Sequence, residues 1–300
     1  ANPDATVTYD PVGSGDGRRN FISGATDFAG TDSALDDDEG ELAGAQDRCG
    51  GDVIQVPAYV SPIAVVFNLD GIESLNLAPA VIAGIFAGEI TSWDAPEIAA
   101  DNSDVDLPST EITVVHRADD SGTTENFTKY LEAVAADVWT YEPDGVWPDA
   151  LSGASGEGTS GLIDLVSQGD GSIGYADDSA AGDLGIAAVG VGEEFNEPSA
   201  EGAAQVVAQS PRTEGVPASD MAVDLARDTT EAGSYPVLLV SYLLACTSYD
   251  DAETAALVKG YLSYVLSADG QIAAQGEAGS APLDRGLADE ALGLVDSISG

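Results

Sequence analysis

Short apolar runs alternate with amphipathic stretches over almost the whole of this 300-residue chain. The runs are rich in Val, Ile and aromatic residues and are bounded by Gly, Pro or Asp, as strands are. Strands that alternate with helices pack into α/β layers with a parallel or mixed sheet. The expected strands are 6–9, 27–29, 53–59, 63–68, 112–116, 172–175, 186–189 and 237–244, and the expected helices are 17–23, 39–46, 79–87, 96–101, 123–135, 160–167, 251–266 and 269–276.

The chain has about the length of two domains, at roughly 150 residues for each domain. Hydrophobic residues make up 44% of it, which is enough for a substantial core and excludes intrinsic disorder. No repeat and no long low-complexity linker interrupts the pattern. We therefore expect two lobes that are joined by strands crossing from one lobe to the other.

Acidic residues dominate the charge, with 53 Asp and Glu against 9 Lys and Arg and a formal net charge of -44. A nucleic-acid partner needs clustered basic residues, and an anionic membrane surface would repel this chain. No apolar run reaches the roughly 18 residues of a membrane span. The acidic excess is typical of proteins kept soluble in saline surroundings. A genome-wide acidic bias is the alternative.

Cys49 and Cys246 are the only cysteines, and the chain has one histidine. The two cysteines have no metal-ligand spacing, so we expect no metal site. They form either one disulfide or two buried thiols. A disulfide between such distant segments would fit an exported protein.

Two turns near the start of the chain have residues suited to an anion. Glycines and Ser14 lie between an expected strand and an expected helix, where backbone N–H groups and a hydroxyl are available to a ligand. An ordinary turn between strand and helix is the alternative. Asp32 and Ser33 follow the next strand, and either residue could instead cap a helix.

The third segment is the most specific of the three. Arg117 follows an expected strand, and the sequence Ser-Gly-Thr at 121–123 opens an expected helix. A guanidinium offers a planar fork of donors to an oxyanion, and a helix N-terminus adds N–H groups. Asp119 can hold the guanidinium in place. A capping box with Glu125 is the alternative, and it is compatible with anion binding.

In this order and spacing, the three segments resemble the phosphate-binding protein of the bacterial ABC phosphate transporter. The resemblance covers most of the chain, and its most specific parts are the Gly-Glu-Ile-Thr-x-Trp and Arg-x-Asp-x-Ser-Gly-Thr sequences. The matching residues are Val12-Gly13-Ser14-Gly15, Thr26-Asp27-Phe28 through Asp32, Ile85-Phe86-Ala87-Gly88-Glu89-Ile90-Thr91-Ser92-Trp93, Arg117-Ala118-Asp119 with Ser121-Gly122-Thr123, Gly171-Ser172-Ile173-Gly174-Tyr175 and Tyr235-Pro236-Val237.

The resemblance implies a two-lobed periplasmic binding protein-like (type II) α/β fold, with a ligand cleft between lobes and two crossing strands, near 63–68 and 236–242. Lobe 1 would comprise residues 1–64 and 242–300, and lobe 2 residues 65–241. A disulfide between Cys49 and Cys246 would then lie within lobe 1. Relative to the family, we expect this sequence to lack the strand, Gly/Ser-rich turn and helix that precede the position of Ala1, together with their ligand contacts.

The resemblance also implies the roles of the site residues. Phosphate would be bound by Ser14, Asp32, Arg117, Ser121, Gly122 and Thr123, and Asp119 would orient Arg117. Asp32 would accept a hydrogen bond from a proton on phosphate, which sulfate lacks. An unpaired buried acceptor costs about 1–3 kcal/mol, so this carboxylate would select phosphate.

The implied function is extracytoplasmic binding of inorganic phosphate and its delivery to an ABC-type import permease, by a monomer without cofactor or catalysis. A lipid anchor on an N-terminal cysteine outside this sequence is also expected. One alternative is a binder of another oxyanion, such as sulfate, molybdate or phosphonate. A secreted serine hydrolase or phosphatase is the other. His116, Asp119 and Ser121 have suitable side chains for it, but no Gly-x-Ser-x-Gly sequence is present.

Overall fold

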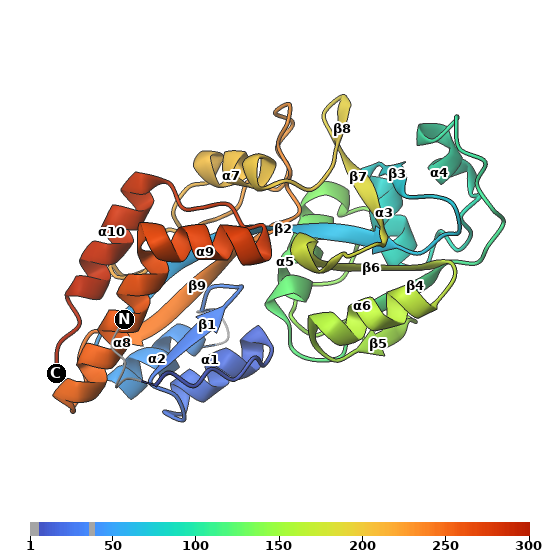
Figure 1. Ribbon diagram of the computed structural model, residues 1–300. Coiled ribbons are helices and arrows are strands. Elements are labelled where there is room, and N and C mark those ends of the chain that lie inside the picture. Colours follow the sequence, from blue (N-terminus) through green and yellow to red (C-terminus); the bar gives the residue numbers. More distant parts are fainter. Residues whose placement is uncertain (1–5, 36–39) are drawn as a thin grey trace. The chain divides into compact units, whose positions relative to one another are not determined.

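The computed structural model describes residues 6–35 and 40–300 (Figure 1). The chain divides into two compact units, which are described here one at a time. Unit 1 contains Ala1–Val60, Pro211–Asp224 and Val240–Gly300, and unit 2 contains Ser61–Ser210 and Leu225–Leu239.

The boundaries differ from the expected ones, which follow residues 64 and 241. The units separate after Val60 and after Leu239, and the segment Pro211–Asp224 belongs to unit 1 rather than to the second lobe. Backbone hydrogen bonds explain that assignment. The N–H of Gln55 donates to the Ser219 carbonyl (3.0 Å), and the N–H of Met221 donates to the Gln55 carbonyl (2.7 Å).

Helices and strands alternate as the sequence predicts. The helices are α1 (Ser14–Ile22), α2 (Glu41–Cys49), α3 (Pro79–Phe86), α4 (Pro96–Asp101), α5 (Gly122–Ala135), α6 (Gly158–Gln168), α7 (Ala200–Gln209), α8 (Ala252–Leu266), α9 (Ala268–Ala278) and α10 (Arg285–Asp296), with a 3-10 turn η1 (Asp178–Ala180). The strands are β1 (Phe28–Thr31), β2 (Val53–Phe67), β3 (Ser74–Leu77), β4 (Thr113–Arg117), β5 (Ala154–Gly156), β6 (Ser172–Asp177), β7 (Gly185–Val191), β8 (Glu194–Asn196) and β9 (Leu238–Cys246).

Strand β2 corrects one expectation, because 53–59 and 63–68 form a single strand of 15 residues. Pro57 and Pro62 lie inside it and donate no backbone hydrogen bond. Their neighbours still find partners outside β2. The N–H of Val60 donates to the Ala281 carbonyl (3.4 Å), and that of Ile63 donates to the Val237 carbonyl (2.8 Å). Strands β2 and β9 each contain residues of both units.

In unit 1, β1 runs antiparallel to β9, with Phe28 opposite Ala245 and Thr31 opposite Tyr242. Helix α1 packs closely on β1. A side chain at Gly17 would place its Cβ 3.0 Å from the Gly30 carbonyl oxygen, so α1 and β1 would have to move slightly apart to accept it. Phe21 of α1 and Leu42 of α2 are fully or almost fully buried in the core beside this strand pair.

In unit 2, β6 lies between β2, to which it is antiparallel, and β4, to which it is parallel. Strand β5 runs parallel to β4, and β3 runs parallel to β7. Two hydrophobic cores result. The larger contains the buried residues of α3 and α5, and the smaller contains those of α6.

The segment 6–9 was expected to be a strand and is not one. Its residues alternate in polarity as a strand does, but a ladder needs a partner, and no strand among the described residues pairs with it. Helices α7 and α10 and strands β3, β5 and β8 were not predicted. Both helices begin after a capping residue that the sequence contains. The side chains of Ser199 and Asp284 accept hydrogen bonds from N–H groups in the first turns of α7 and α10, respectively.

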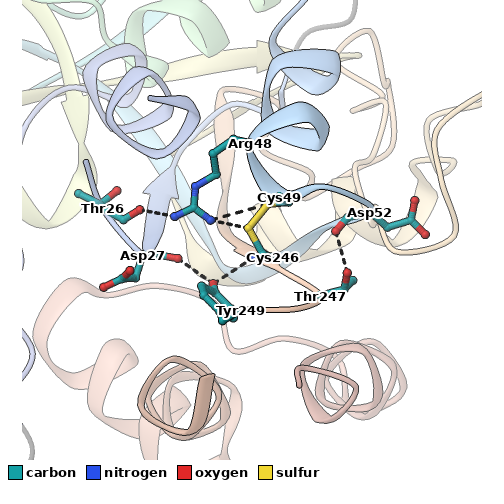
Figure 2. Close-up of a disulfide and its surroundings, with 8 residues drawn as sticks. All are labelled: Thr26, Asp27, Arg48, Cys49, Asp52, Cys246, Thr247 and Tyr249. Atoms are coloured by element: carbon teal, nitrogen blue, oxygen red, sulfur yellow. Dashed lines mark hydrogen bonds between the residues drawn. A yellow bond between two sulfur atoms is a disulfide. The ribbon is translucent and has the colours of Figure 1, made fainter. Parts of the chain in front are cut away.

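The disulfide between Cys49 and Cys246 is confirmed, with 5.3 Å between the two Cα atoms (Figure 2). It joins the last residue of α2 to the last residue of β9. The Arg48 guanidinium lies over the ring of Phe21, with 4.7 Å to the centroid, and donates to both sulfur atoms and to the Thr26 carbonyl. The Tyr249 hydroxyl donates to the Asp27 carbonyl (2.7 Å). These contacts fix the segment that enters β1.

Candidate functional site

The predicted site residues fall into two groups, one in each unit. Ser14 and Asp32 belong to unit 1, and the segment from Arg117 to Thr123 belongs to unit 2. Each group is described within its own unit.

In unit 1, the glycine-rich turn is the N-terminus of α1 itself. The helix begins at Ser14 and not at residue 17, and the N–H of Gly17 donates to the Gly13 carbonyl (2.9 Å). Gly13 is the N-cap, and no side chain caps this helix. The first N–H groups of a helix have no partner within the helix, so this end is suited to an anion.

The structure brings Ser14 and Asp32 together. The N–H of Asp32 donates to the hydroxyl of Ser14 over 3.0 Å, and Ser14 is 7% exposed. The helix-cap alternative for Asp32 and Ser33 fails for the next described helix, α2. That helix begins at Glu41 after Gly40, without a side-chain cap. Asp32 is half-buried and directly follows β1.

In unit 2, Arg117 and Asp119 form a bidentate pair. Arg117 is the last residue of β4 and is 8% exposed. Its Nε donates to Asp119 Oδ1 (2.7 Å), and its Nη2 donates to Asp119 Oδ2. The pair confirms the predicted contact. A guanidinium held in this way has a fixed orientation, and its remaining N–H groups keep a defined direction.

The environment of Asp119 favours its charged form. Burial raises the pKa of this carboxyl, but the hydrogen bonds and charge of Arg117 and the N–H of Gly158 lower it by more, so that the pKa lies below its usual value. The N–H of Gly158 donates to Asp119 Oδ1 over 3.0 Å. Asp119 is therefore ionised near neutral pH.

Ser121 is the N-cap of α5, and its hydroxyl accepts a hydrogen bond from the N–H of Thr124 (3.3 Å). The cap interpretation is thus correct for Ser121, whereas the Glu125 carboxylate contacts Lys129 Nζ (2.6 Å). Gly122 is the first helical residue, and Thr123 is 6% exposed. The N-cap of α5 is thus four residues after Arg117 in the sequence, and the helix begins one residue later.

The structure adds residues that the sequence motifs do not indicate. Arg117 Nη1 donates to the Thr159 hydroxyl (3.5 Å), at the start of α6. Gly158, whose N–H binds Asp119, has a φ of +64°, which side-chain-bearing residues rarely adopt. The glycine-rich sequence before α6 was an available signal for this second helix N-terminus.

Tyr175 is buried and contacts both Arg117 and the first turn of α5. Its hydroxyl contacts the Thr124 hydroxyl (2.8 Å) and accepts a hydrogen bond from the N–H of Arg117 (3.4 Å). Burial raises the pKa of Tyr175, which keeps the phenol neutral. The ring stacks on Phe127 of α5, with 4.4 Å between centroids.

The contacts of His116 do not suit a catalytic base. Its ring stacks on Trp147, with 5.2 Å between centroids, and its Nδ1 donates to the Arg117 carbonyl (2.9 Å). The Ser121 hydroxyl is engaged as a helix cap. The residues of the hydrolase alternative therefore have structural roles.

Replacing Asp119 with asparagine is expected to destabilise the protein at neutral pH by about 1–3 kcal/mol, because Arg117 loses a buried acceptor. The pKa of Asp119 is lowered by folding, so its contribution is present above the unfolded pKa of about 4 and is lost as pH falls through the folded value. Urea unfolding of the wild type and of the Asp119→Asn variant between pH 7 and pH 3 measures this. The difference between their free energies of unfolding should become smaller toward pH 3. A difference in free energy of unfolding that stays the same at every pH would contradict the stabilising role of the Asp119 carboxylate.

Among the described residues, no helix has the length and apolar character that a membrane crossing needs.

Comparison with known proteins extends over both groups of residues. Residues 1–269 match the family described as the PBP superfamily domain. The phosphate-binding protein PstS2 of Mycobacterium bovis is 34% identical over 309 residues, covering 99% of this chain and 80% of that protein. The phosphate-binding protein PstS 3 of Mycobacterium tuberculosis is 35% identical over 279 residues, covering 89% of this chain and 73% of that protein.

A solved structure shows the same fold. It is the high-affinity periplasmic phosphate-binding protein PfluDING bound with phosphate, with a TM-score of 0.77 and 23% identity over 96% of this chain and 88% of that one. The expected periplasmic binding protein-like fold of mixed α/β type is thereby confirmed.

Proposed function

The chain belongs to the PstS family of phosphate-binding proteins, and on this premise we propose that it binds inorganic phosphate with Ser14 and Asp32 of unit 1 and with Arg117, Ser121, Gly122 and Thr123 of unit 2. We propose that it binds phosphate for an ABC-type phosphate transporter and that it is not an enzyme.

The arrangement of Arg117 is the observation that carries this proposal. The guanidinium is buried and held by Asp119 in the same segment that leads into α5. A phosphate ion near the first turn of α5 would receive charge-assisted hydrogen bonds from Arg117 and N–H donors from the helix. Ser14 and the N-terminus of α1 offer the same kind of donors in unit 1.

Isothermal titration calorimetry of the purified chain with phosphate, sulfate and a neutral sugar tests the proposal. We expect one-to-one binding of phosphate and much weaker binding of sulfate. Clear heat with the sugar and none with phosphate would overturn it, and a preference for sulfate would support the alternative of another oxyanion.

Asp32 explains a preference for phosphate over sulfate. Phosphate carries at least one proton at neutral pH, and a carboxylate can accept a hydrogen bond from it. Sulfate has no such proton to donate, so the carboxylate would repel it. The selectivity for phosphate over sulfate would therefore come from the Asp32 carboxylate, which accepts a hydrogen bond, whereas the other proposed contacts donate.

Replacing Asp32 with asparagine should therefore narrow the ratio of phosphate to sulfate affinity by about tenfold, because an amide can donate as well as accept. Competition calorimetry with both anions measures the ratio. Asp16→Asn is a suitable control, because Asp16 is an exposed carboxylate of α1 that pairs with Arg19. An unchanged ratio in the Asp32 variant would remove this residue from the selectivity mechanism.

We propose that the protein acts outside the cytoplasm, where a disulfide such as Cys49–Cys246 persists. We propose in addition that a monomer delivers phosphate to the membrane permease of the transporter. A lipid anchor, if it is made through cysteine, needs a residue outside this sequence, because Cys49 and Cys246 are both in the disulfide. Mass spectrometry of the protein isolated from its own cell envelope tests for that lipid.

A further inference from the structure

Arg18 is a buried cation that none of the predicted ligand contacts uses. It lies in α1, four residues after Ser14, so the two side chains are on the same face of the helix. Arg18 is only 5% exposed, whereas the side chain of the next residue, Arg19, is 57% exposed. A buried arginine requires partners that repay its desolvation.

The contacts of Arg18 converge on the turn that contains Asp32. Its Nη1 donates to the Thr31 hydroxyl (3.2 Å) and to the Ser33 hydroxyl, which are the residues on either side of Asp32. The Thr31 hydroxyl donates in turn to the Ser33 carbonyl (2.7 Å). The N–H of Asp32 itself donates to Ser14 on the same helix. Ser14 and Arg18, on one face of α1, thus form hydrogen bonds with Thr31, Asp32 and Ser33.

Glu41 completes the arrangement. Arg18 Nε donates to Glu41 Oε1 over 2.8 Å, and the two side chains are 7% and 12% exposed. The carboxylate balances the charge of Arg18 and fixes the plane of its guanidinium. A lysine has no planar fork, so it could not bind Glu41 and both hydroxyls with the same geometry.

We propose that Arg18 is a positioning residue for Asp32 and thereby contributes to the affinity for phosphate. The inference rests on the proposed function. Hydrogen bonds to a charged donor are stronger than neutral ones, and they fix the backbone on both sides of Asp32. Without them the turn relaxes and its carboxylate loses alignment with the proton on phosphate. Arg18 acts through Asp32, so its effect must depend on that carboxylate.

A double-mutant cycle with Arg18→Met and Asp32→Asn tests this dependence, with phosphate affinity measured by calorimetry. Arg18→Met should weaken phosphate binding by about tenfold in the wild-type background and by less than about twofold in the Asp32→Asn background. Arg18→Lys should restore only part of the loss. Equal losses in the two backgrounds would overturn the proposal.

Arg19→Met is the matched control, because it removes the same charge from the neighbouring exposed position. It should leave phosphate affinity within about twofold of wild type, since exposed charges are screened by salt. A loss as large as that of Arg18→Met would show a general charge effect and overturn the positioning role.

Removing Arg18 takes the guanidinium away from the largely covered Glu41 carboxylate, and this loss can prevent folding. If Arg18→Met does not fold, Arg18→Met/Glu41→Leu removes both charges and takes its place in the cycle, with the same outcomes. Failure of wild type to bind phosphate would overturn the proposed function and this inference with it. Phosphate binding with equal losses in the cycle would overturn the inference alone.

Discussion

Replacing Arg117 with alanine is expected to weaken phosphate binding by about 2–5 kcal/mol, which is a factor of about 30 to several thousand in Kd. The guanidinium is 8% exposed, so its hydrogen bonds to an anion form with little competition from water. The protein carries a formal net charge of -44, and few other cations can replace it. Calorimetry with phosphate measures the loss.

Two variants separate the charge of Arg117 from its orientation. Arg117→Lys keeps the charge but loses the bidentate contact with Asp119, and it should recover only part of the affinity. Asp119→Ala keeps the guanidinium and removes its support, and it should cost less than Arg117→Ala. Affinity within about threefold of wild type for Arg117→Ala would exclude Arg117 as a ligand.

Removing the disulfide is expected to lower the free energy of unfolding by about 2–5 kcal/mol. Cys49 and Cys246 are 197 residues apart in the sequence, so their bond restricts a long loop in the unfolded chain. Cys246 is 1% exposed in the core of unit 1, beside Phe21. Guanidinium unfolding of the Cys49→Ser/Cys246→Ser variant measures the effect.

Reduction of the wild-type protein with dithiothreitol should reproduce most of this loss, since it opens the same bond. Arg48→Met serves as a control, because it removes the guanidinium from the sulfur atoms and from Phe21 while the disulfide stays intact. That variant should lose about 1 kcal/mol. Equal unfolding midpoints for wild type and the double serine variant would mean that the bond contributes no stability.

The boundaries of the units depend both on local sequence and on packing between distant segments. Proline and serine at residues 57–62 indicate a break between two strands, yet β2 continues through them because segments from elsewhere in the chain supply its partners. Pro211–Asp224 joins unit 1 for a similar reason, through hydrogen bonds with Gln55. In both cases the hydrogen-bond partners are distant in the sequence, so the local residues do not reveal them.

The alternation of helices and strands follows from the sequence alone, and so does the choice of residues 117–123 as the strongest candidate for anion binding. Both depend on residues that are close together in the chain, because periodicity, capping and the bidentate contact with Asp119 act over a few residues.

Packing between distant segments fixes which further residues support these candidate site residues. Arg18 reaches Thr31 and Ser33 across the interface of α1 with β1, and Gly158 and Thr159 reach Asp119 and Arg117 from α6. These contacts join residues that are 13 to 42 positions apart. Their formation depends on how helices pack on strands, and the spacing of residues along the chain does not encode that packing.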